Sequence, residues 1–287
     1  MPEDADFPAL VRPATAAEEE DPRALHRANR SAWDEAAERY EGWFDEAVEL
    51  IRRGGSNLFG VEHDLLGDLR AGAGIGRAIH LQCAAGRDTL SLWTAGAREV
   101  VGVDFSPRML ELARRLAAAT GAPARWIEAD VLETPHELDG TADLVYTGRG
   151  SLIWLHDLDE WAGVVRRLLA PTGRFVCFEG HPAEWLFDAD EDGRLIATEY
   201  DYFGGIEASR GWAPEYIDRL SIPEAGQHWK YARAWTLGEV VTAVAGAGLR
   251  IERLAEYPVD WWAGHRDLRP EDRGRIPLSF GLVARVG

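Results

Sequence analysis

The stretch from Ala78 to Ser106, AIHLQCAAGRDTLSLWTAGAREVVGVDFS, decides the fold. It begins with an apolar run, passes through the small-residue turn Ala84-Ala85-Gly86 into apolar residues at helical spacing, and ends with a second apolar run closed by Asp104. A strand, a tight turn, a helix, a strand and a carboxylate make up half of a nucleotide-binding α/β unit. Backbone N–H groups and the helix dipole attract a ligand to such a turn. Asp104 follows Gly86 at about the 20-residue spacing expected of a carboxylate that binds a ribose diol.

The bulk composition is that of a globular protein. The chain has 287 residues, of which 46% are hydrophobic, and a formal net charge of −18. So negative a surface repels phosphate backbones and anionic lipids, which argues against nucleic acid and membrane partners. Cys83 and Cys177 fall in apolar runs, as buried free thiols of a reducing compartment do. No signal peptide or membrane-length apolar run is visible, so we expect a cytoplasmic protein.

Strand and helix patterns alternate along most of the chain. A helix is expected from Ser31 to the glycines at 54–55, because serine is a good N-cap and apolar residues then recur at helical spacing. A second helix is expected over 57–69. The glycines between 72 and 76 precede the first strand, so they do not form a dinucleotide fingerprint. Further strands are expected over 124–131, 142–147, 174–179, 249–254 and 277–286, with helices over 107–120, 157–169 and 236–246. This alternation predicts an α/β fold with a mostly parallel sheet covered by helices on both faces.

With these elements in place, the sequence resembles the class I S-adenosylmethionine-dependent methyltransferases. The resemblance covers about 78–180 and the chain from Thr236 to its end. In that family the first strand and loop usually read acid-x-Gly-x-Gly-x-Gly, and here His80 stands at the acid, Gln82 and Ala84 stand at two of the glycines, and Gly86 is retained. The sequence also looks like a bacterial subgroup with a His-Leu-Gln-Cys string followed by Gly-x-Asp-Thr-Leu-Ser. With the acid replaced, another group or water must meet the ammonium of the ligand.

The resemblance implies a Rossmann-like fold with a seven-stranded, mostly parallel sheet, and S-adenosyl-L-methionine as cofactor. We divide the chain on this basis into five parts. They are a mobile N-terminal tail (1–24), an N-terminal helical cap (25–77), a cofactor-binding α/β core (78–180), an inserted aromatic lid on the substrate side (181–235) and a C-terminal completion of the sheet (236–287). The aromatic lid suits a flat or cationic acceptor, and a core built from large residues is the alternative.

Cofactor contacts are expected where the strands end. Small residues at 84 and 86 let the backbone approach the methionine portion, and the amide at 82 is placed to bond the amino-acid end. Asp104 is expected to accept both ribose hydroxyls, with Phe105 or Met109 on the adenine. Asp130 resembles the family acid that accepts the adenine amino group, next to the Val131 N–H. The predicted cofactor-binding residues are Trp33, Tyr40, Gln82, Ala84, Gly86, Asp104, Phe105, Met109, Asp130, Val131, Thr147 and Gly148.

Some of these assignments have alternatives. Trp33 and Tyr40 are interpreted as the roof of the ligand pocket or as part of an amphipathic helix docked on the domain. Thr147 and Gly148 end the fourth strand, where the sulfonium and its methyl group are expected. His80 lies inside an apolar strand, which favours a hydrogen-bonded core histidine over a ligand contact. Arg149 is interpreted as a solvated loop charge.

Methyl transfer from a sulfonium is an in-line displacement, so the protein mainly aligns the reactants and excludes water. A hydroxyl or protonated amine as acceptor also needs a base. The best candidate is His181, just past the fifth strand, although a turn histidine before Pro182 is the alternative. His156 and His228 are weaker candidates. The eight histidines are scattered without ligand spacing, so no metal site is predicted.

The sequence therefore predicts an S-adenosylmethionine-dependent methyltransferase acting on a small molecule whose acceptor atom, O, N or C, is left open. A non-catalytic module that binds S-adenosylmethionine is one alternative. A nucleotide-cofactor oxidoreductase is another, disfavoured because the first loop lacks three spaced glycines. The oligomeric state is also left open.

Overall fold

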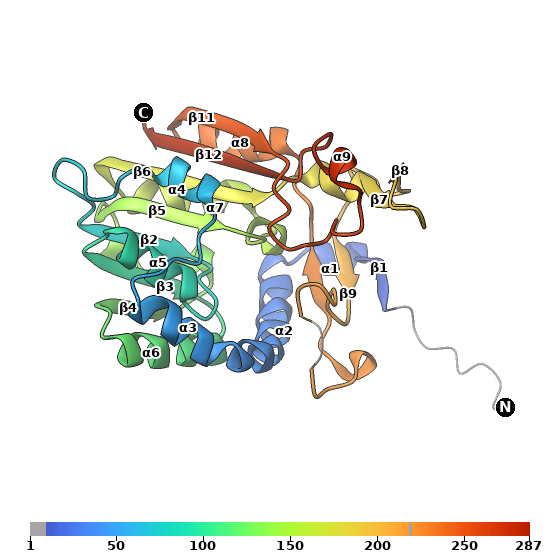
Figure 1. The fold of residues 1–287 in the computed structure, drawn as a ribbon, viewed down its shortest axis with the longest axis horizontal. Helices are drawn as coiled ribbons and strands as arrows, with labels where there is room; N and C mark the ends of the chain where they lie inside the picture. Colours follow the sequence, from blue (N-terminus) through green and yellow to red (C-terminus); the bar gives the residue numbers. More distant parts are fainter. Residues whose placement is uncertain (1–9, 218–219) are drawn as a thin grey trace.

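The computed structural model describes residues 10–217 and 220–287, and its centre is a seven-stranded sheet (Figure 1). The strand order is β11-β12-β6-β5-β2-β3-β4. The strands from β6 to β4 are parallel to their neighbours, whereas β12 runs antiparallel to both β6 and β11. This confirms the predicted α/β fold with a mostly parallel sheet. The bounds are β2 (Arg77–Leu81), β3 (Glu99–Asp104), β4 (Ala124–Glu128), β5 (Ala142–Gly148), β6 (Leu169–Gly180), β11 (Leu249–Tyr257) and β12 (Ser279–Val286).

Helices cover both faces of this sheet. One face packs on α3 (Phe44–Arg52), α4 (Gly60–Leu66), α5 (Arg87–Ala95) and α6 (Pro107–Thr120). The other face packs on α7 (Leu158–Leu168) and α8 (Leu237–Gly246), where Trp161 and Phe175 form the bulkiest contact with rings 5.6 Å apart. Buried apolar strands between two helical layers are the arrangement expected of a parallel sheet.

The helix ends follow local sequence rules. Ser106 caps α6 by accepting a hydrogen bond from the Met109 N–H at 3.1 Å, and Gly121 ends the helix in a left-handed conformation. Thr236 and Glu239 form a reciprocal capping box at the start of α8. The ends of these helices are therefore encoded locally.

The chain reverses direction across the sheet at one point. After β2, β3 and β4 are added in sequence on one side of β2, and β5 then pairs with the other side of β2. In open α/β sheets, the carboxyl ends of the strands at such a switch point form a crevice that binds ligands. The site is therefore sought between the loops that follow β2 and β5.

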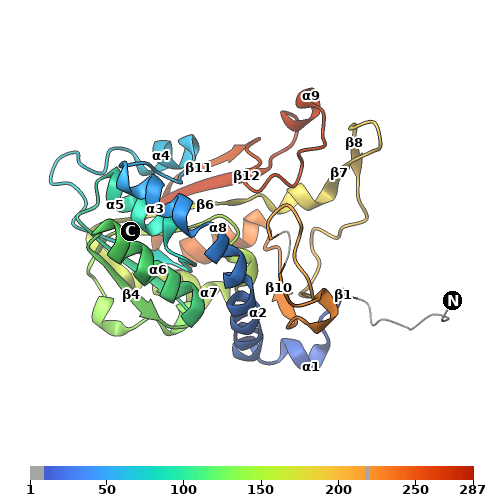
Figure 2. The ribbon, with the colours of Figure 1, turned by 60° about the horizontal axis from the view of Figure 1, so that its bottom comes forward.

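Next to the main sheet lies a smaller unit, seen on the right of Figure 1 and turned forward in Figure 2. A three-stranded sheet in the order β1-β9-β10 packs beside the long helix α2 (Pro22–Gly42), and a hairpin of β7 and β8 extends from the segment after β6. The bounds are β1 (Val11–Pro13), α1 (Ala16–Glu19), β7 (Phe187–Ala189), β8 (Leu195–Ala197), β9 (Glu207–Ser209), β10 (Lys230–Ala232) and α9 (Pro270–Arg273). Single turns of 3-10 helix are η1 (Val131–Glu133), η2 (His136–Leu138), η3 (Leu152–Trp154), η4 (Pro182–Leu186) and η5 (Glu224–Gly226).

The N-terminal elements differ from the sequence prediction. The long helix begins at Pro22 and not at Ser31, because Asp21 caps it by accepting the Ala24 N–H at 3.0 Å and Pro22 occupies its first position. It ends at Gly42, and the predicted single helix to 54 is two helices, α2 and α3. The helix expected over 57–69 is the shorter α4.

The tail predicted as mobile is structured from residue 10 onward, since β1 pairs with β9 and α1 is closed by a capping box. Residues 1–9, the rest of that predicted tail, lie outside the described residues. Among the described residues, no helix is both long enough and apolar enough to cross a membrane.

Candidate cofactor and acceptor site

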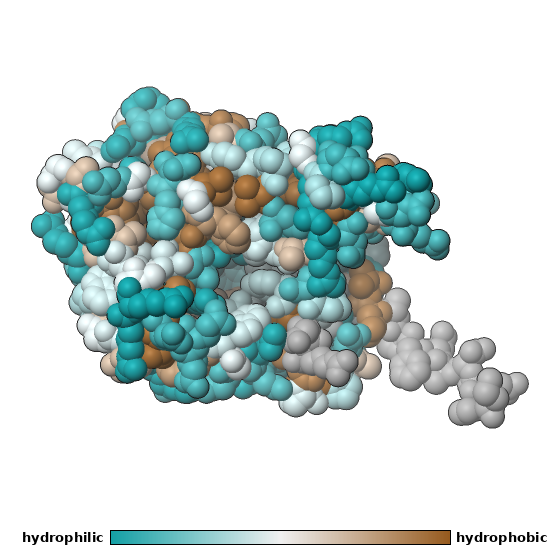
Figure 3. All heavy atoms as spheres, in the orientation of Figure 1, coloured by the Kyte–Doolittle hydropathy of each residue, from teal (hydrophilic) through white to brown (hydrophobic). Residues whose placement is uncertain are grey.

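A cavity of about 460 Å³ opens at the carboxyl ends of the strands, at the predicted switch point. Its walls are the loops after β2, β3, β4 and β5, closed from above by α2, the start of α3 and the segment around Trp261. Figure 3 shows the face of the molecule hollowed near its centre. The volume lies in the range of sites for small ligands and cofactors. This space is called the first cavity below.

The loop after β2 holds two residues in an unusual backbone conformation. Gln82 has φ 57° and Ala84 has φ 44°, both in the left-handed region that favours glycine. These are the positions at which the resembled family usually has glycine. The chain therefore adopts a backbone conformation that favours glycine at two positions that carry side chains.

Gly86 serves packing as well as the cavity wall. It adopts φ +77°, and a Cβ at this position would lie 2.4 Å from the Trp126 ring and 2.9 Å from the Ala113 side chain. A glycine is therefore required for the turn into α5 to sit against α6 and β4. The predicted close approach to a ligand is thus not the only reason for this glycine.

Asp104 ends β3 at the cavity wall and is 6% exposed. One carboxylate oxygen accepts the Ala84 N–H at 2.7 Å and the other accepts the Ser106 N–H at 2.9 Å. Burial raises the pKa of Asp104 to about 6, although these N–H donors favour its ionised form. The carboxylate thus ties the loop after β2 to the loop after β3, and each oxygen retains a lone pair for a further donor.

Asp130 lies after β4 and also lines the first cavity. Its Oδ2 is 2.7 Å from Nδ1 of His26 on α2, and its Oδ1 accepts the Leu132 N–H at 3.0 Å. Burial opposes ionisation, but the His26 hydrogen bond and charge hold the pKa of Asp130 below its usual value. The predicted adenine acid is therefore bridged to the helix that covers the cavity.

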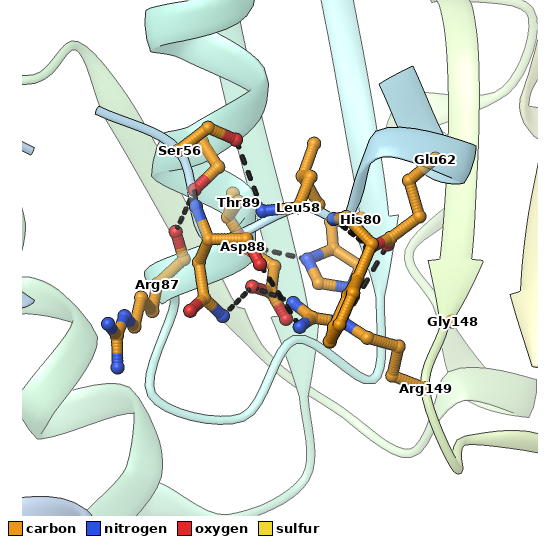
Figure 4. A network of polar contacts seen from close by, with 12 residues as sticks. Ser56, Leu58, Glu62, His80, Arg87, Asp88, Thr89, Gly148 and Arg149 are labelled. Atoms are coloured by element: carbon orange, nitrogen blue, oxygen red, sulfur yellow. Dashed lines mark hydrogen bonds and ion pairs between the residues drawn. The ribbon is translucent and has the colours of Figure 1, made fainter. Parts of the chain in front are cut away.

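A buried polar network lies beneath the loop after β5 (Figure 4). Arg149 forms ion pairs with Asp88 at the start of α5 and, at 3.6 Å, with Glu62 on α4. Glu62 accepts hydrogen bonds from the Tyr146 hydroxyl and the Phe59 N–H. The Arg149 side chain is 11% exposed, so it is not the solvated loop charge that the sequence predicted. Nothing in the local sequence reveals this burial, because the two acids lie on other elements.

His80 occupies the centre of β2 and donates or accepts a hydrogen bond with the Thr89 hydroxyl at 2.8 Å. Burial lowers the pKa of His80 to about 4, so the ring is neutral near pH 7. This is the hydrogen-bonded core histidine that the sequence favoured, although its ring also borders the first cavity. Asp88 of the buried polar network also lines the cavity, and Arg149 holds the pKa of this carboxyl below its usual value despite its burial.

Ten of the twelve predicted cofactor-binding residues line the first cavity, and their role in binding stays a prediction. They are Trp33, Tyr40, Gln82, Ala84, Gly86, Asp104, Phe105, Asp130, Val131 and Gly148. Met109 does not line it, because its fully buried side chain points into the cluster between α2 and α6. Thr147 does not line it either, because its hydroxyl donates to the Leu81 carbonyl inside the sheet.

The roof of the first cavity is an aromatic cluster. Trp33 and Tyr40 of α2 both line the cavity, and the Trp33 ring packs against the rings of Tyr40, Trp154, Trp212 and Tyr216 with centroids 4.9–6.4 Å apart. The Tyr40 and Tyr216 hydroxyls are hydrogen-bonded at 2.9 Å. The sequence left two interpretations of Trp33 and Tyr40, the roof of the ligand pocket and a helix face docked on the domain. In the structure the same surface of α2 does both.

A second cavity of about 450 Å³ adjoins the first. Gly150, Trp154, Tyr216, Trp261 and Trp262 line both cavities and form their common wall. Beyond this wall the second cavity is bordered by β6, η4 and the small sheet β1-β9-β10. Its aromatic residues come from the segment predicted as a lid, from Trp154 and Phe280, and from the 261–262 pair. The sequence alone did not place the 261–262 pair at the site.

Two buried carboxylic acids border the second cavity. Glu179 is 2% exposed and accepts the N–H groups of Gly150, Ser151 and Leu152 at 2.6–3.1 Å, so it fixes the loop after β5. Glu184 on η4 is 3% exposed and accepts the Trp262 indole N–H at 3.1 Å. Burial raises the pKa of Glu179 to about 7 and that of Glu184 to about 8.

His181 lies between β6 and η4 but borders neither cavity. Its Nε2 is 2.8 Å from Glu256, and its Nδ1 accepts the Ala183 N–H at 3.1 Å. The histidine thus caps η4, which is the turn role that the sequence left as the alternative. His156 borders neither cavity, and His228 pairs with Glu35 on α2. Across residues 10–217 and 220–287, no group of three or more His, Cys, Asp or Glu side chains is arranged to hold a metal.

The residues present fit the predicted cofactor. Asp104 offers lone pairs to a ribose diol, and an acidic side chain at Asp88 and an amide at Gln82 border the same cavity. Oε1 of Gln82 is buried and has no hydrogen-bond partner in the described part of the chain, since its Nε2 donates to the Ser151 carbonyl at 2.8 Å. An orphaned acceptor facing a cavity is a position for a ligand donor.

Comparisons with known proteins agree with this geometry. Residues 78–173 match a family described as "Methyltransferase domain". The demethylmenaquinone methyltransferase of Thermus thermophilus is 41% identical over 152 residues, which cover 50% of this chain and 68% of the relative. A protein of the same name from Deinococcus radiodurans is 38% identical over 92 residues, covering 32% of this chain and 37% of the relative.

Solved structures share the fold at low sequence identity. An S-adenosylmethionine dependent methyltransferase from Mesorhizobium loti has a TM-score of 0.54 at 24% identity, covering 78% of this chain and 95% of the other. A geranyl diphosphate C-methyltransferase from Streptomyces coelicolor, solved with S-adenosyl-L-homocysteine, has a TM-score of 0.53 at 14% identity, covering 79% and 78%. The predicted enzyme activity and cofactor are therefore confirmed: the chain belongs to the class I S-adenosylmethionine-dependent methyltransferases.

Proposed function

We propose that this enzyme methylates a flat, largely apolar small molecule that binds in the second cavity. The observation that carries the proposal is that the two cavities adjoin and share five lining residues, so that a cofactor in the first and an acceptor in the second would meet where these residues lie. The second cavity is lined by tryptophans, which offer large flat surfaces to an acceptor. A net charge of −18 is against nucleic acid as the acceptor.

The ten cavity residues named above are proposed to hold the cofactor. Asp104 would accept the ribose hydroxyls, and Phe105 would pack on the adenine. Asp130 would accept the adenine amino group through lone pairs not used by His26, with the Val131 N–H beside it. Gly148 lies where the strand-end loop meets the common wall, next to the position proposed for the methyl group.

The ammonium of the cofactor is proposed to bind between Gln82 and Asp88. The neutral His80 cannot replace the family acid, whereas the Asp88 carboxylate is held ionised by Arg149. The free Oε1 of Gln82 accepts one ammonium hydrogen. In this proposal the acid that binds the ammonium lies in the first turn of α5, whereas the resembled family has it in the first strand.

The bound cofactor supplies an electrophilic methyl group that needs no further activation. The protein's part is to align the acceptor and exclude water, which raises the effective concentration of the reacting groups. The aromatic roof and the common wall provide that enclosure. The demethylmenaquinone named for two relatives belongs to the flat, apolar class of molecules, and it is one member of the class proposed here.

Three finer predictions from the sequence remain proposals. Membership of the His-Leu-Gln-Cys subgroup rests on the string itself and on its unusual left-handed residues. A small-molecule acceptor without nucleic acid partners rests on the charge and on the size of the second cavity, about 450 Å³. A cytoplasmic location rests on two buried, unpaired cysteines, Cys83 and Cys177.

Calorimetry and a turnover panel test this function. We expect S-adenosylmethionine and S-adenosylhomocysteine to bind and NAD not to bind. With radiolabelled methyl donor, flat aromatic acceptors are expected to be methylated faster than short aliphatic amines, thiols or acids. Turnover confined to aliphatic acceptors would contradict the assignment of the second cavity.

A further inference from the structure

Of the two buried carboxyl groups that border the second cavity, Glu184 is the one with a hydrogen-bond donor on only one of its oxygens among the described residues. It projects from η4, immediately after β6, and Trp262 donates to its Oε2 at 3.1 Å. No group in the described ranges 10–217 and 220–287 donates a hydrogen bond to Oε1. By contrast, both oxygens of the neighbouring Glu179 accept backbone N–H groups. Oε1 is therefore a position for a donor that comes from a ligand.

The space around Oε1 is shaped by flat rings and by a residue without a side chain. A Cβ added at Gly180 would lie 2.7 Å from this oxygen, so the glycine keeps the approach open. Trp185 and Trp262 stack at a tilt with centroids 5.3 Å apart, and the buried indole N–H of Trp261 has no hydrogen-bond partner among the described residues. Trp261 and Trp262 also line the first cavity, so the tryptophan that donates to Glu184 borders the proposed cofactor site as well.

We propose that Glu184 binds the hydroxyl of a hydroxyaromatic methyl acceptor and removes its proton during transfer. This inference rests on the proposed function, since it names the substrate class for the same cavity. The acceptor O–H bond breaks and its proton goes to Oε1 of Glu184. The freed oxygen electron pair forms a bond to the methyl carbon while the bond from carbon to sulfur breaks, and that electron pair stays on sulfur. The proton then leaves Glu184 to water when the products depart.

The electrostatics of the cavity agree with a hydroxyl rather than a cation as ligand. Lys230 lines the same cavity, with its ammonium 4.8 Å from the Trp212 ring, and it would repel a second cation. Burial, together with the charges of Asp260 and Glu179, raises the pKa of Glu184 to about 8. A carboxylate of high pKa is a strong base, and it takes a proton from a phenol more readily than an ordinary glutamate does. The titratable groups that face it are Glu179, Asp260 and His265. Further charged or titratable groups border the same cavity, namely Lys230, Arg210, Glu207, Glu224 and Tyr216.

Naphthol and its methyl ether are the probes, because they share a flat shape and differ in the hydroxyl donor. Above pH 8, where Glu184 is ionised, fluorescence titration with S-adenosylhomocysteine present is expected to show that the wild type binds naphthol about tenfold more tightly than the ether, the scale for a hydrogen bond to a charged group. The variant Glu184→Leu is expected to bind both probes equally. Glu184→Gln keeps an acceptor oxygen, so it is expected to retain the preference while methyl transfer to naphthol falls about 100-fold or more.

The variant Glu191→Gln is the matched control, because Glu191 is an exposed acid on the β7–β8 turn. It is expected to behave as the wild type in both assays. The rate of the wild type is expected to rise with pH toward 8, and that rise is expected to be absent in Glu184→Gln.

Binding of S-adenosylhomocysteine is measured first for every variant. Two results would overturn the role of Glu184 and leave the proposed function intact, provided that the wild type binds the cofactor normally. One is equal affinity of the wild type for naphthol and its ether, and the other is a preference for naphthylmethylamine over naphthol. Failure of the wild type to bind S-adenosylhomocysteine overturns the proposed function, and this inference with it.

Discussion

Arg149→Met removes a buried cation that is shared by two acids. The Arg149 guanidinium lies between Asp88 and Glu62, and it also donates to the Asn57 carbonyl at 3.2 Å (Figure 4). Methionine keeps most of the length of the side chain and can pack on the Phe59 ring that the guanidinium now covers. The variant therefore isolates the loss of charge from the loss of volume.

The expected loss follows from the exposure of the partners. Removing one member of a buried ion pair costs about 3–5 kcal/mol, because it leaves an uncompensated charge. The Glu62 side chain is 0% exposed, but its carboxyl keeps the hydrogen bonds from Tyr146 and Phe59, and its pKa is already raised by burial. The Asp88 side chain is 24% exposed and retains water on one side. We therefore expect the lower end, a loss of about 3 kcal/mol in the free energy of unfolding at pH 7.

Urea denaturation followed by circular dichroism measures this loss. Arg77→Met is the control, because Arg77 and Glu99 form an ion pair at 3.0 Å with side chains 32% and 43% exposed, which is worth about 1 kcal/mol or less. Adding Asp88→Asn to Arg149→Met is expected to cost less than the sum of the two single losses, since the two groups interact. A loss no larger than that of the control, or strictly additive losses, would refute a buried, coupled network beneath the cavity.

The remaining predictions concern single groups of the two cavities. Ala84→Gly is expected to raise the free energy of unfolding by about 1 kcal/mol, because glycine adopts the left-handed conformation of this residue without strain. Ala162→Gly inside α7 is the control and is expected to lower the free energy of unfolding by a similar amount. Equal losses of stability in the two variants would contradict this reasoning. Asp104→Asn is expected to weaken S-adenosylhomocysteine binding by about 1–3 kcal/mol in calorimetry. In the wild type that affinity is expected to fall as the pH drops below about 6, where the buried acid takes up a proton, and the Asn variant is expected to lack this dependence. Glu184→Gln is expected to stabilise the fold increasingly as pH rises from the ordinary glutamate pKa of 4.5 to about 8, because in that window the unfolded chain has released a proton that the folded one retains. Thermal unfolding of the wild type and of Glu184→Gln measures this across the same pH range. A difference in stability between the two that did not grow with pH would contradict the prediction.

Much of the fold could be predicted from local patterns. The alternation of apolar strands and helices predicted the order of these elements along the chain. The caps at Ser106 and Thr236 also lie where the sequence placed them. The acid at the end of the second predicted strand lies on the cavity wall for the same reason, because parallel strands end at one edge of the sheet.

Other features depend on contacts between distant segments, so the sequence could not reveal them. The burial of Arg149 requires acids from α4 and α5, and the structure of the first described residues requires pairing with β9. His181 was the best candidate for a base because it follows a strand, with a turn histidine as the alternative. That position alone does not show that its ring is engaged by Glu256 and Ala183. Glu184 carries no motif, and only the closure of the second cavity around it distinguishes it from other acids.

A crystal structure with S-adenosylhomocysteine tests the central claim most directly. We expect the nucleoside in the first cavity, with both ribose hydroxyls within hydrogen-bond distance of Asp104 and the amino group next to Gln82 and Asp88. The sulfur is expected to face the wall formed by Trp261 and Trp262. A nucleoside bound outside the first cavity, or a ribose that does not contact Asp104, would contradict the account.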